Sequence, residues 1–277
     1  NVHIICDKPL TATIDEAKKL EKLVKKKKVI FALTHNYSSY PMLREAKVIV
    51  EKGKVGKVLL INVEYPQGYT VAIKKKDAVS KLKWRLDPKM CGPSMILSEI
   101  GTHAYHLLRY VTSLEAKEVS AEVSSLSSEL SVDDNAFLIL RMSNNARASI
   151  WVSSAATGGE NGLKIRVYGT KGAVEWFQDD PNILKFTELN KSTKIITRAN
   201  NEVSNFSLES SRVAAGHPEG FFEAFANIYT EFADSIINKK KSINKNTYPN
   251  IQDGVKGIKF IFAAKKSSNN NSRWIKL

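Results

Sequence analysis

Two short apolar runs near the start of the chain constrain the fold more than any other feature. They are VHIIC at 2–6 and VIFAL at 29–33, and such continuous β-branched runs are typical of strands in a parallel sheet covered on both faces. Between them, residues 13–28 have apolar residues at helical spacing and lysines at the end. A second helix is expected from about Ser39 to a stop at Gly53. This strand–helix–strand–helix order predicts a doubly wound α/β unit with right-handed crossovers.

After Gly53 the pattern changes, because strand-like segments dominate. They are 57–65, 118–126, 135–142, 147–154, 163–169 and 172–177. Hairpin-type turns between several of them predict an open, mostly antiparallel or mixed sheet. Helices are expected at 99–111, 218–238 and 251–268, on one face of that sheet. The chain should therefore divide near residue 56 into an α/β part, 1–56, and a larger α+β domain, 57–277.

Composition excludes several classes of protein. The formal charge is +14, from 42 Lys and Arg against 28 Asp and Glu, but the basic clusters at 25–28, 74–76 and 238–242 contain no interleaved aromatic residues and match no nucleic-acid motif. We therefore expect no nucleic-acid partner. No apolar run approaches the ~20 residues of a membrane span. Cys6 and Cys91 are too few and too far apart for a disulfide framework, which favours reduced thiols and a cytoplasmic protein.

Lys8 is the first candidate site residue. It follows the strand at 2–6, and Pro9 restricts the turn after it. Ligands of open α/β sheets bind in the crevice beyond the carboxyl ends of the strands, where Lys8 should lie. A surface lysine in a loop remains the alternative from position alone.

The second candidate site is the helix at 99–111. Glu99, His103 and His106 are spaced i, i+4 and i+7, so they should share one face of this helix. A carboxylate one turn from an imidazole can hold one ring nitrogen and present the other as an acid or base. A zinc site is the competing interpretation, but no further His or Cys cluster lies nearby in the sequence to complete a ligand set.

Four segments together resemble one family. CDKPLT at 6–11 resembles its EKP motif, and SEIGTHAYHLLRYV at 98–111 resembles its D-x-G-x-H helix. Segments 34–58 and 83–103 resemble the stretches that precede the second domain and that helix. These motifs are those of the glucose-fructose oxidoreductase/inositol dehydrogenase (Gfo/Idh/MocA) family, and the resemblance extends from residue 2 to nearly the end of the chain.

The resemblance implies an NAD- or NADP-dependent dehydrogenase acting on a sugar, cyclitol or related polyol. Residues 1–56 would then be the C-terminal remainder of a Rossmann-type dinucleotide-binding domain, and 57–277 the substrate-binding and oligomerisation domain. Lys8 would stabilise negative charge on the reacting hydroxyl, His103 would accept its proton as general base, and Glu99 would orient His103. Hydride would pass to the nicotinamide.

The resemblance also implies the other contacts of the site and the assembly. The predicted cofactor-binding residues are Lys8, Pro9, His35, Asn36, Trp84 and Arg85. The predicted substrate-binding residues are Lys8, His103 and His217. The open face of the second domain's sheet would pack against another subunit, giving a homodimer or homotetramer.

Two features depart from the family pattern. No G-x-G-x-x-G turn occurs in the sequence, so the loop that would bind the cofactor pyrophosphate is missing, as is the residue that would distinguish NAD from NADP. Glu99 stands where the family has Asp. The alternative prediction is therefore a non-catalytic, truncated relic that acts as a sugar-binding or oligomerising domain.

Overall fold

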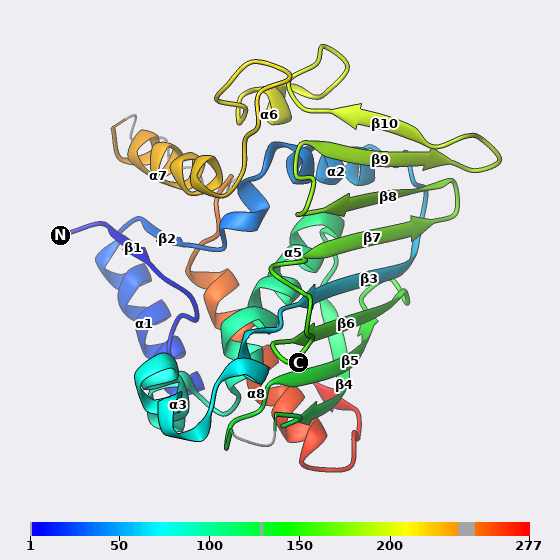
Figure 1. Ribbon diagram of the computed structural model, residues 1–277. Helices are drawn as coiled ribbons and strands as arrows, with labels where there is room; N and C mark the ends of the chain where they lie inside the picture. Colours follow the sequence, from blue (N-terminus) through cyan, green and yellow to red (C-terminus); the bar gives the residue numbers. More distant parts are fainter. Residues whose placement is uncertain (1, 128–129, 238–246) are drawn as a thin grey trace.

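The first two strands are parallel and each is followed by a helix, which confirms the order predicted for the first 53 residues. In the computed structural model, which describes residues 2–127, 130–237 and 247–277, β1 (Ile4–Cys6) pairs with β2 (Phe31–Leu33). The crossover is α1 (Ile14–Lys27), and β2 is followed by a 3₁₀ turn (Asn36–Ser39) and α2 (Pro41–Glu51). In Figure 1, β1, β2 and α1 lie together at the left, whereas α2 lies against the large sheet beside β8 and β9.

The rest of the chain is built on a nine-stranded sheet. Its strands in chain order are β3 (Val58–Pro66), β4 (Ala116–Ser124), β5 (Asn135–Met142), β6 (Arg147–Ser153), β7 (Lys164–Gly169), β8 (Gly172–Phe177), β9 (Ile183–Glu188), β10 (Lys194–Thr197) and β11 (Ile275–Lys276). The spatial order is β10-β9-β8-β7-β3-β6-β5-β4-β11. Only the β3–β6 pair is parallel, and the other neighbours are antiparallel. The predicted mixed, mostly antiparallel sheet is therefore confirmed.

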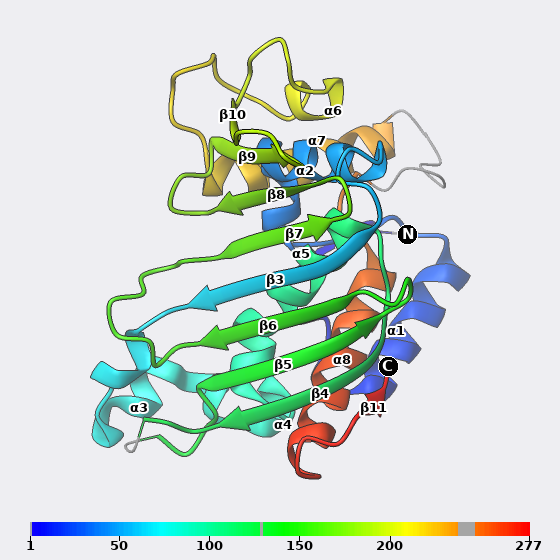
Figure 2. The same ribbon diagram turned by 90° about the vertical axis from the view of Figure 1, so that its right-hand side faces the viewer.

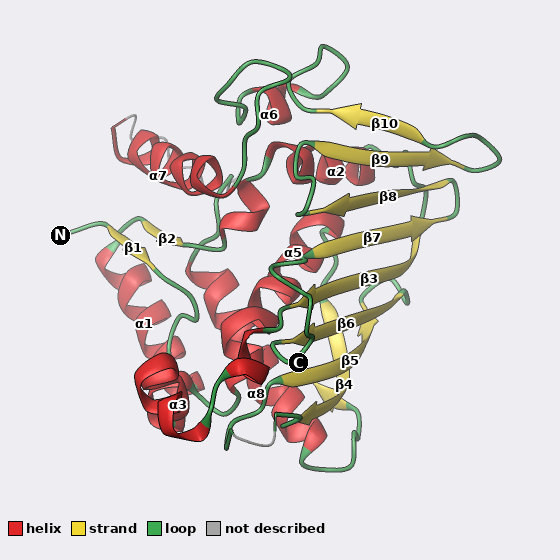
Figure 3. Cartoon of the chain, in the orientation of Figure 1, coloured by secondary structure: helices red, strands yellow, loops and turns green. Residues whose placement is uncertain are grey.

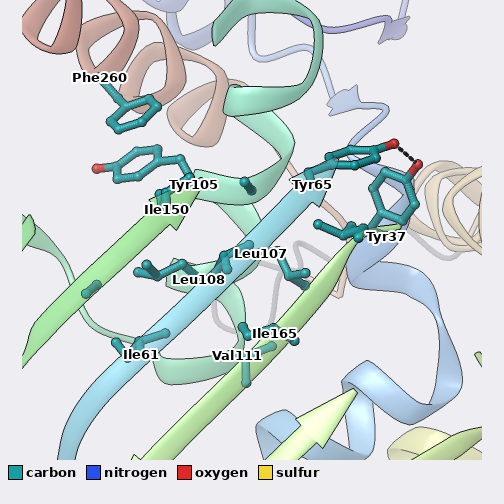
Figure 4. Packing of buried hydrophobic residues seen from close by; sticks show 14 of the residues in the cluster. Tyr37, Ile61, Tyr65, Tyr105, Leu107, Leu108, Val111, Ile150, Ile165 and Phe260 are labelled. Atoms are coloured by element: carbon teal, nitrogen blue, oxygen red, sulfur yellow. Dashed lines mark hydrogen bonds between the residues drawn. The ribbon is translucent and has the colours of Figure 1, made fainter. Parts of the chain in front are cut away.

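Helices cover one face of this sheet and leave the other open. Figure 2 looks onto the open face, with α2, α5 (Thr102–Thr112) and α8 (Ile251–Ser268) behind the strands. The core lies between them: Leu107, Leu108 and Val111 of α5 point at strand residues such as Ile61 and Ile165 (Figure 4). A second contact joins α5 to α8, where the Tyr105 and Phe260 rings stack 4.1 Å apart.

The helix predicted at 99–111 is not one regular helix. Residues Leu97–Gly101 form a π-helix that runs directly into α5. Short π-helical segments are rare and often occur at functional sites. Glu99 and His103 nevertheless line the same cavity, and the rings of His103 and His106 both contact His35.

The remaining helices lie beside the sheet, some near its β10 end and others toward its β4 end (Figure 2; Figure 3). They are 3₁₀ turns at Tyr69–Ala72 and Lys83–Leu86 and α-helices α3 (Lys75–Leu82), α4 (Pro88–Cys91), α6 (Asn205–Leu208) and α7 (Phe221–Ile237). In the part of the chain that the structure describes, none of the helices has the length and apolar character needed to cross a bilayer. Both cysteines are free.

Candidate active site

A cavity of about 350 Å³ lies where β1, β2 and β3 end opposite the π-helix. Residues from segments far apart in the sequence line it: Asp7, Lys8, Thr34, Asn36, Tyr37, Tyr65, Gln67, Trp84, Arg85, Glu99, Ile100, His103, Asn161, Phe221 and Phe225. The carboxyl ends of the parallel strands β1 and β2 thus face a binding cavity, as expected for an open α/β sheet.

Lys8 reaches from the end of β1 to the π-helix. Its ammonium donates a hydrogen bond to the main-chain carbonyl of Glu99, and the Lys8–Pro9 peptide bond is cis. Burial lowers the pKa of Lys8 below its ordinary value, while the nearby carboxylates of Glu99 and Asp7 act in the opposite direction. Lys8 is therefore not the solvated loop lysine of the alternative interpretation.

Glu99 is held by an arginine. The guanidinium of Arg85 donates from Nε to Oε2 at 2.8 Å and from Nη2 to Oε1 at 3.0 Å, and it also lies over the Trp84 ring, 4.8 Å from its centroid. Burial raises the pKa of Glu99, but the hydrogen bonds from Arg85 and the charge of Lys8 lower it more, so the net pKa is below the ordinary value. The carboxylate of Glu99 is therefore ionised at neutral pH, and both of its oxygens accept hydrogen bonds from Arg85.

His103 lines the cavity from the first turn of α5. It is 7% exposed, and its Nδ1 lies 3.2 Å from Nδ1 of His35. Burial, the charge of Lys8 and the two neighbouring histidines lower the pKa of His103 well below its ordinary value. His103 is therefore a neutral imidazole that can accept a proton.

The hydrogen bond predicted from Glu99 to His103 is replaced by another. Among the described residues, the Glu99 carboxylate pairs with Arg85 and the partner of His103 Nδ1 is His35. His35 itself is 1% exposed and is not among the residues that line the cavity, so its contact with the cofactor stays a prediction. It stacks on His106, with ring centroids 4.4 Å apart and planes inclined by 8°.

The wall opposite His103 carries polar groups. Tyr65 donates a hydrogen bond to Oδ1 of Asn161 at 2.8 Å, Gln67 donates to the same oxygen at 2.6 Å, and the hydroxyls of Tyr65 and Tyr37 contact each other (Figure 4). Sequence reasoning did not single out Tyr65, Gln67, Asn161, Phe221 or Phe225. Tyr65 lies at the end of β3 and Gln67 directly follows it, much as Lys8 follows β1, which was an available signal. The loop position of Asn161 offered none.

The other predicted contacts divide into two groups. Asn36, Trp84 and Arg85 line the cavity, and Nδ2 of Asn36 is buried without a hydrogen-bond partner among the described residues.

His217 does not line this cavity. It is exposed and lines a separate hollow with Arg198, whose guanidinium binds the His217 carbonyl at 2.8 Å. Its contact with the substrate stays a prediction that this position does not support.

Comparisons with known proteins agree with this arrangement. The sequence profile of the GFO/IDH/MocA C-terminal domain matches residues 43–175. The uncharacterized oxidoreductase YfiI of Bacillus subtilis is 30% identical over 280 residues, which cover 99% of this chain and 71% of YfiI.

The chain belongs to the Gfo/Idh/MocA family.

Two other similar proteins of known function or structure extend the comparison. Levoglucosan dehydrogenase of Pseudarthrobacter phenanthrenivorans is 28% identical over 195 residues, which cover 62% of this chain but only 48% of that enzyme. The crystal structure of an inositol dehydrogenase homolog from Azotobacter vinelandii, complexed with NAD⁺, matches with a TM-score of 0.93 and 27% identity, and covers 100% of this chain and 72% of that one. The relatives of this Gfo/Idh/MocA chain are thus oxidoreductases, and the resemblance found in its sequence is confirmed.

Proposed function

We propose that this chain supplies the substrate side, and the nicotinamide-facing edge, of an NAD(P)-dependent dehydrogenase that oxidises a sugar, cyclitol or related polyol. The observation that carries the proposal is the meeting of Lys8, Glu99 and His103 at one cavity, although 91 residues separate Lys8 from the Glu99 carbonyl that it binds. The names of the relatives, an inositol dehydrogenase homolog and a levoglucosan dehydrogenase, support this substrate class.

The residues present fit one end of a dinucleotide cofactor. The cavity lies beyond β1 and β2, and the unpartnered amide of Asn36 and the ammonium of Lys8 could hold the nicotinamide end there. No G-x-G-x-x-G turn for the pyrophosphate occurs in the sequence. When bound, the nicotinamide would accept a hydride from the carbon that bears the reacting hydroxyl.

This chain's own residues would handle the proton. His103 Nδ1 is engaged by His35, so Nε2 is the ring nitrogen left to accept the hydroxyl proton. The Lys8 ammonium, fixed by the Glu99 carbonyl, would stabilise the negative charge that develops on that oxygen in a site from which water is partly excluded. The Glu99–Arg85 pair and the hydroxyls and amides of Tyr37, Asn161 and Gln67 would bind the remaining hydroxyls.

The direct test is cofactor reduction with a panel of polyols. The 277-residue chain, and the same chain extended by a glycine-rich nucleotide-binding segment from a relative, are assayed with NAD⁺ and NADP⁺ on myo-inositol, levoglucosan and simple sugars. We expect turnover in the extended form, and a loss of about 10²- to 10⁴-fold in the His103→Asn variant because general-base catalysis is removed. Polyol binding without turnover in both forms would favour the non-catalytic relic instead, and turnover unaffected by His103→Asn would contradict the assigned roles.

The assembly is part of the same proposal. On the open face of the sheet, Phe137 and Ile139 are 55% and 52% exposed, and Phe137 stacks on Trp151 with centroids 6.0 Å apart. A hollow of about 510 Å³ lies beside them. Exposed apolar surface of this kind marks an interaction site, and we propose that it packs against a second copy in a homodimer or homotetramer. The cytoplasmic location predicted from the sequence stays a prediction.

A further inference from the structure

The base proposed above has an unusual partner. An imidazole that acts as a base is commonly oriented by a carboxylate on its other ring nitrogen, and the acid expected in that role, Glu99, is bound by Arg85 through both of its oxygens. The only side chain in the described residues that hydrogen-bonds to His103 is another histidine, His35, through Nδ1 of each ring. Two neutral imidazoles can share such a contact only if one nitrogen carries the proton and the other does not.

The proton transfer proposed for the cavity determines which of the two rings donates the hydrogen bond. If His103 takes a proton from the substrate, its Nε2 must carry a lone pair, and its own proton must then be on Nδ1. His103 therefore donates and His35 accepts, which requires the proton of His35 to be on Nε2. Each histidine is restricted to one of its two tautomers by the other.

We propose that His35 is a positioning residue, which accepts the hydrogen bond from Nδ1 of His103 and so keeps Nε2 of His103 unprotonated and directed at the cavity. This inference rests on the proposed function of His103. It adds the residue that fixes the tautomer of the base, a role that sequence reasoning had given to Glu99.

His106 completes the arrangement by packing. Its ring is stacked against that of His35, and both of its nitrogens are buried without a hydrogen-bond partner among the described residues. The stack limits rotation of the His35 ring, so that Nδ1 stays in line with His103. The nearby guanidinium of Arg109 disfavours positive charge on His35.

The charged surroundings agree with a neutral partner. The groups near His35 come from three parts of the chain: Lys8 after β1, His103, His106 and Arg109 on α5, and Asp253 at the start of α8. Burial and His106 lower the pKa of His35 well below its ordinary value, and Asp253 opposes them only in part. Imidazolium is therefore disfavoured at His35, and the accepting lone pair on Nδ1 is kept.

The decisive experiment measures the tautomers and does not depend on turnover. Two-bond ¹H–¹⁵N correlation spectra of the ¹⁵N-histidine-labelled 277-residue chain report which nitrogen carries the proton, and with five histidines each signal can be assigned by single substitution. We expect the proton of His103 on Nδ1 and that of His35 on Nε2. The reverse pair of tautomers would overturn the proposal even if polyol oxidation were demonstrated.

A matched pair of variants separates the hydrogen bond from packing. His35→Phe keeps a ring against His106 but has no acceptor, whereas His35→Asn can place its amide oxygen near the position of Nδ1. We expect His35→Phe to lose the Nδ1–H preference of His103 and to lower kcat about tenfold with little change in KM, the size expected for one neutral hydrogen bond. His35→Asn should recover both.

The outcomes are distinct for the two proposals. If both variants change kcat equally while the tautomer of His103 is unaltered, His35 acts only through packing and the inference fails. If the tautomers and their response to His35→Phe are as expected but no polyol is oxidised by any form, the proposed function fails while the tautomer assignment stands. A thermal unfolding curve for each variant excludes loss of the fold as the cause.

Discussion

Arg85 and Glu99 hold each other through two parallel hydrogen bonds, of 2.8 and 3.0 Å, at the rim of the cavity. Arg85→Lys keeps the positive charge but cannot donate two parallel hydrogen bonds from one planar group, so the carboxylate of Glu99 becomes free to rotate. We expect KM for the polyol to rise about tenfold, the value of one good hydrogen bond, with a smaller change in kcat. Steady-state kinetics measure both. Arg147→Lys is the control, because Arg147 is exposed and its guanidinium donates only to main-chain carbonyls; equal effects of the two substitutions would contradict the role of Arg85.

Lys8→Met should reduce kcat by about 10²- to 10³-fold, the cost of removing one group that stabilises developing negative charge. Methionine fills a similar volume, so the fold should be retained. The matched control is Lys19→Met on the exposed face of α1, which should leave kcat unaltered. Turnover of Lys8→Met within a factor of two of the unmodified chain would remove Lys8 from the mechanism.

The three buried histidines make stability depend on pH. The pKa of His106 is lowered to about 3 by burial and by the charges of Arg109 and Lys47, and the pKa values of His35 and His103 are also well below the ordinary value. As the pH falls below 6.5, the unfolded chain binds protons at these residues and the folded chain does not, down to about pH 3 for His106, so the free energy of unfolding falls. Each histidine contributes up to about 1.4 kcal/mol per pH unit.

Urea unfolding at several pH values tests this dependence. His106→Phe removes one of the three protons, so its stability should fall less steeply below pH 6.5 than that of the unmodified chain. His217→Phe, at an exposed position outside this cluster, is the matched control for replacing a histidine by phenylalanine. An equal slope for His106→Phe and the unmodified chain would show that His106 is protonated in the folded state.

Gly254 of α8 allows Leu10, two residues after Lys8, to approach the helix. A Cβ at position 254 would lie 2.9 Å from Cδ2 and 3.0 Å from Cβ of Leu10. Alanine would gain about 1 kcal/mol of helix propensity, but overpacking costs about 1 to 3 kcal/mol, so Gly254→Ala should destabilise the fold. The sign should reverse when Leu10→Ala is also present, because the contact is then removed. Denaturant unfolding of the four proteins measures this, and a stabilising effect in both backgrounds would exclude the close contact.

Phe137→Asp should dissociate the proposed assembly. The substitution places a charge in the exposed apolar surface of β5, where a second copy would have to desolvate it. Size-exclusion chromatography with light scattering gives the mass of each form. Leu189→Asp, outside this surface and equally exposed to solvent in a β-turn, should not change the mass. A monomeric unmodified chain would contradict the proposal directly.

The sequence predicted the parts of this fold that have a strong local pattern. Apolar runs found β1 and β2, and helical spacing together with the Thr13–Glu16 capping box found α1. The edge strands β10 and β11 were not predicted, because they are short and carry little periodicity. The inner strand β9 was also missed, although Leu184 and Phe186 are buried at alternating positions. The π-helix was not predicted either, since its hydrogen-bond pattern depends on packing against distant segments.

The candidate site was predictable to the same extent. Lys8, Glu99 and His103 follow from motifs, and they line one cavity. The contact between His35 and His103 spans 68 residues, and no local spacing encodes it. The position of Asn161 depends in the same way on tertiary structure, because its loop is brought to Tyr65 by the pairing of β3 with β6 and β7.

The ammonium of Lys8 is anchored on a peptide oxygen of the π-helix and not on a side chain. Every amino acid supplies that oxygen, so sequence drift at position 99 over evolutionary time would leave the ammonium in place. A lineage could therefore adapt position 99 to a new substrate without moving its charge-stabilising group. An insertion or deletion within Leu97–Gly101, in contrast, would displace the Lys8 ammonium and the side chain at position 99 together.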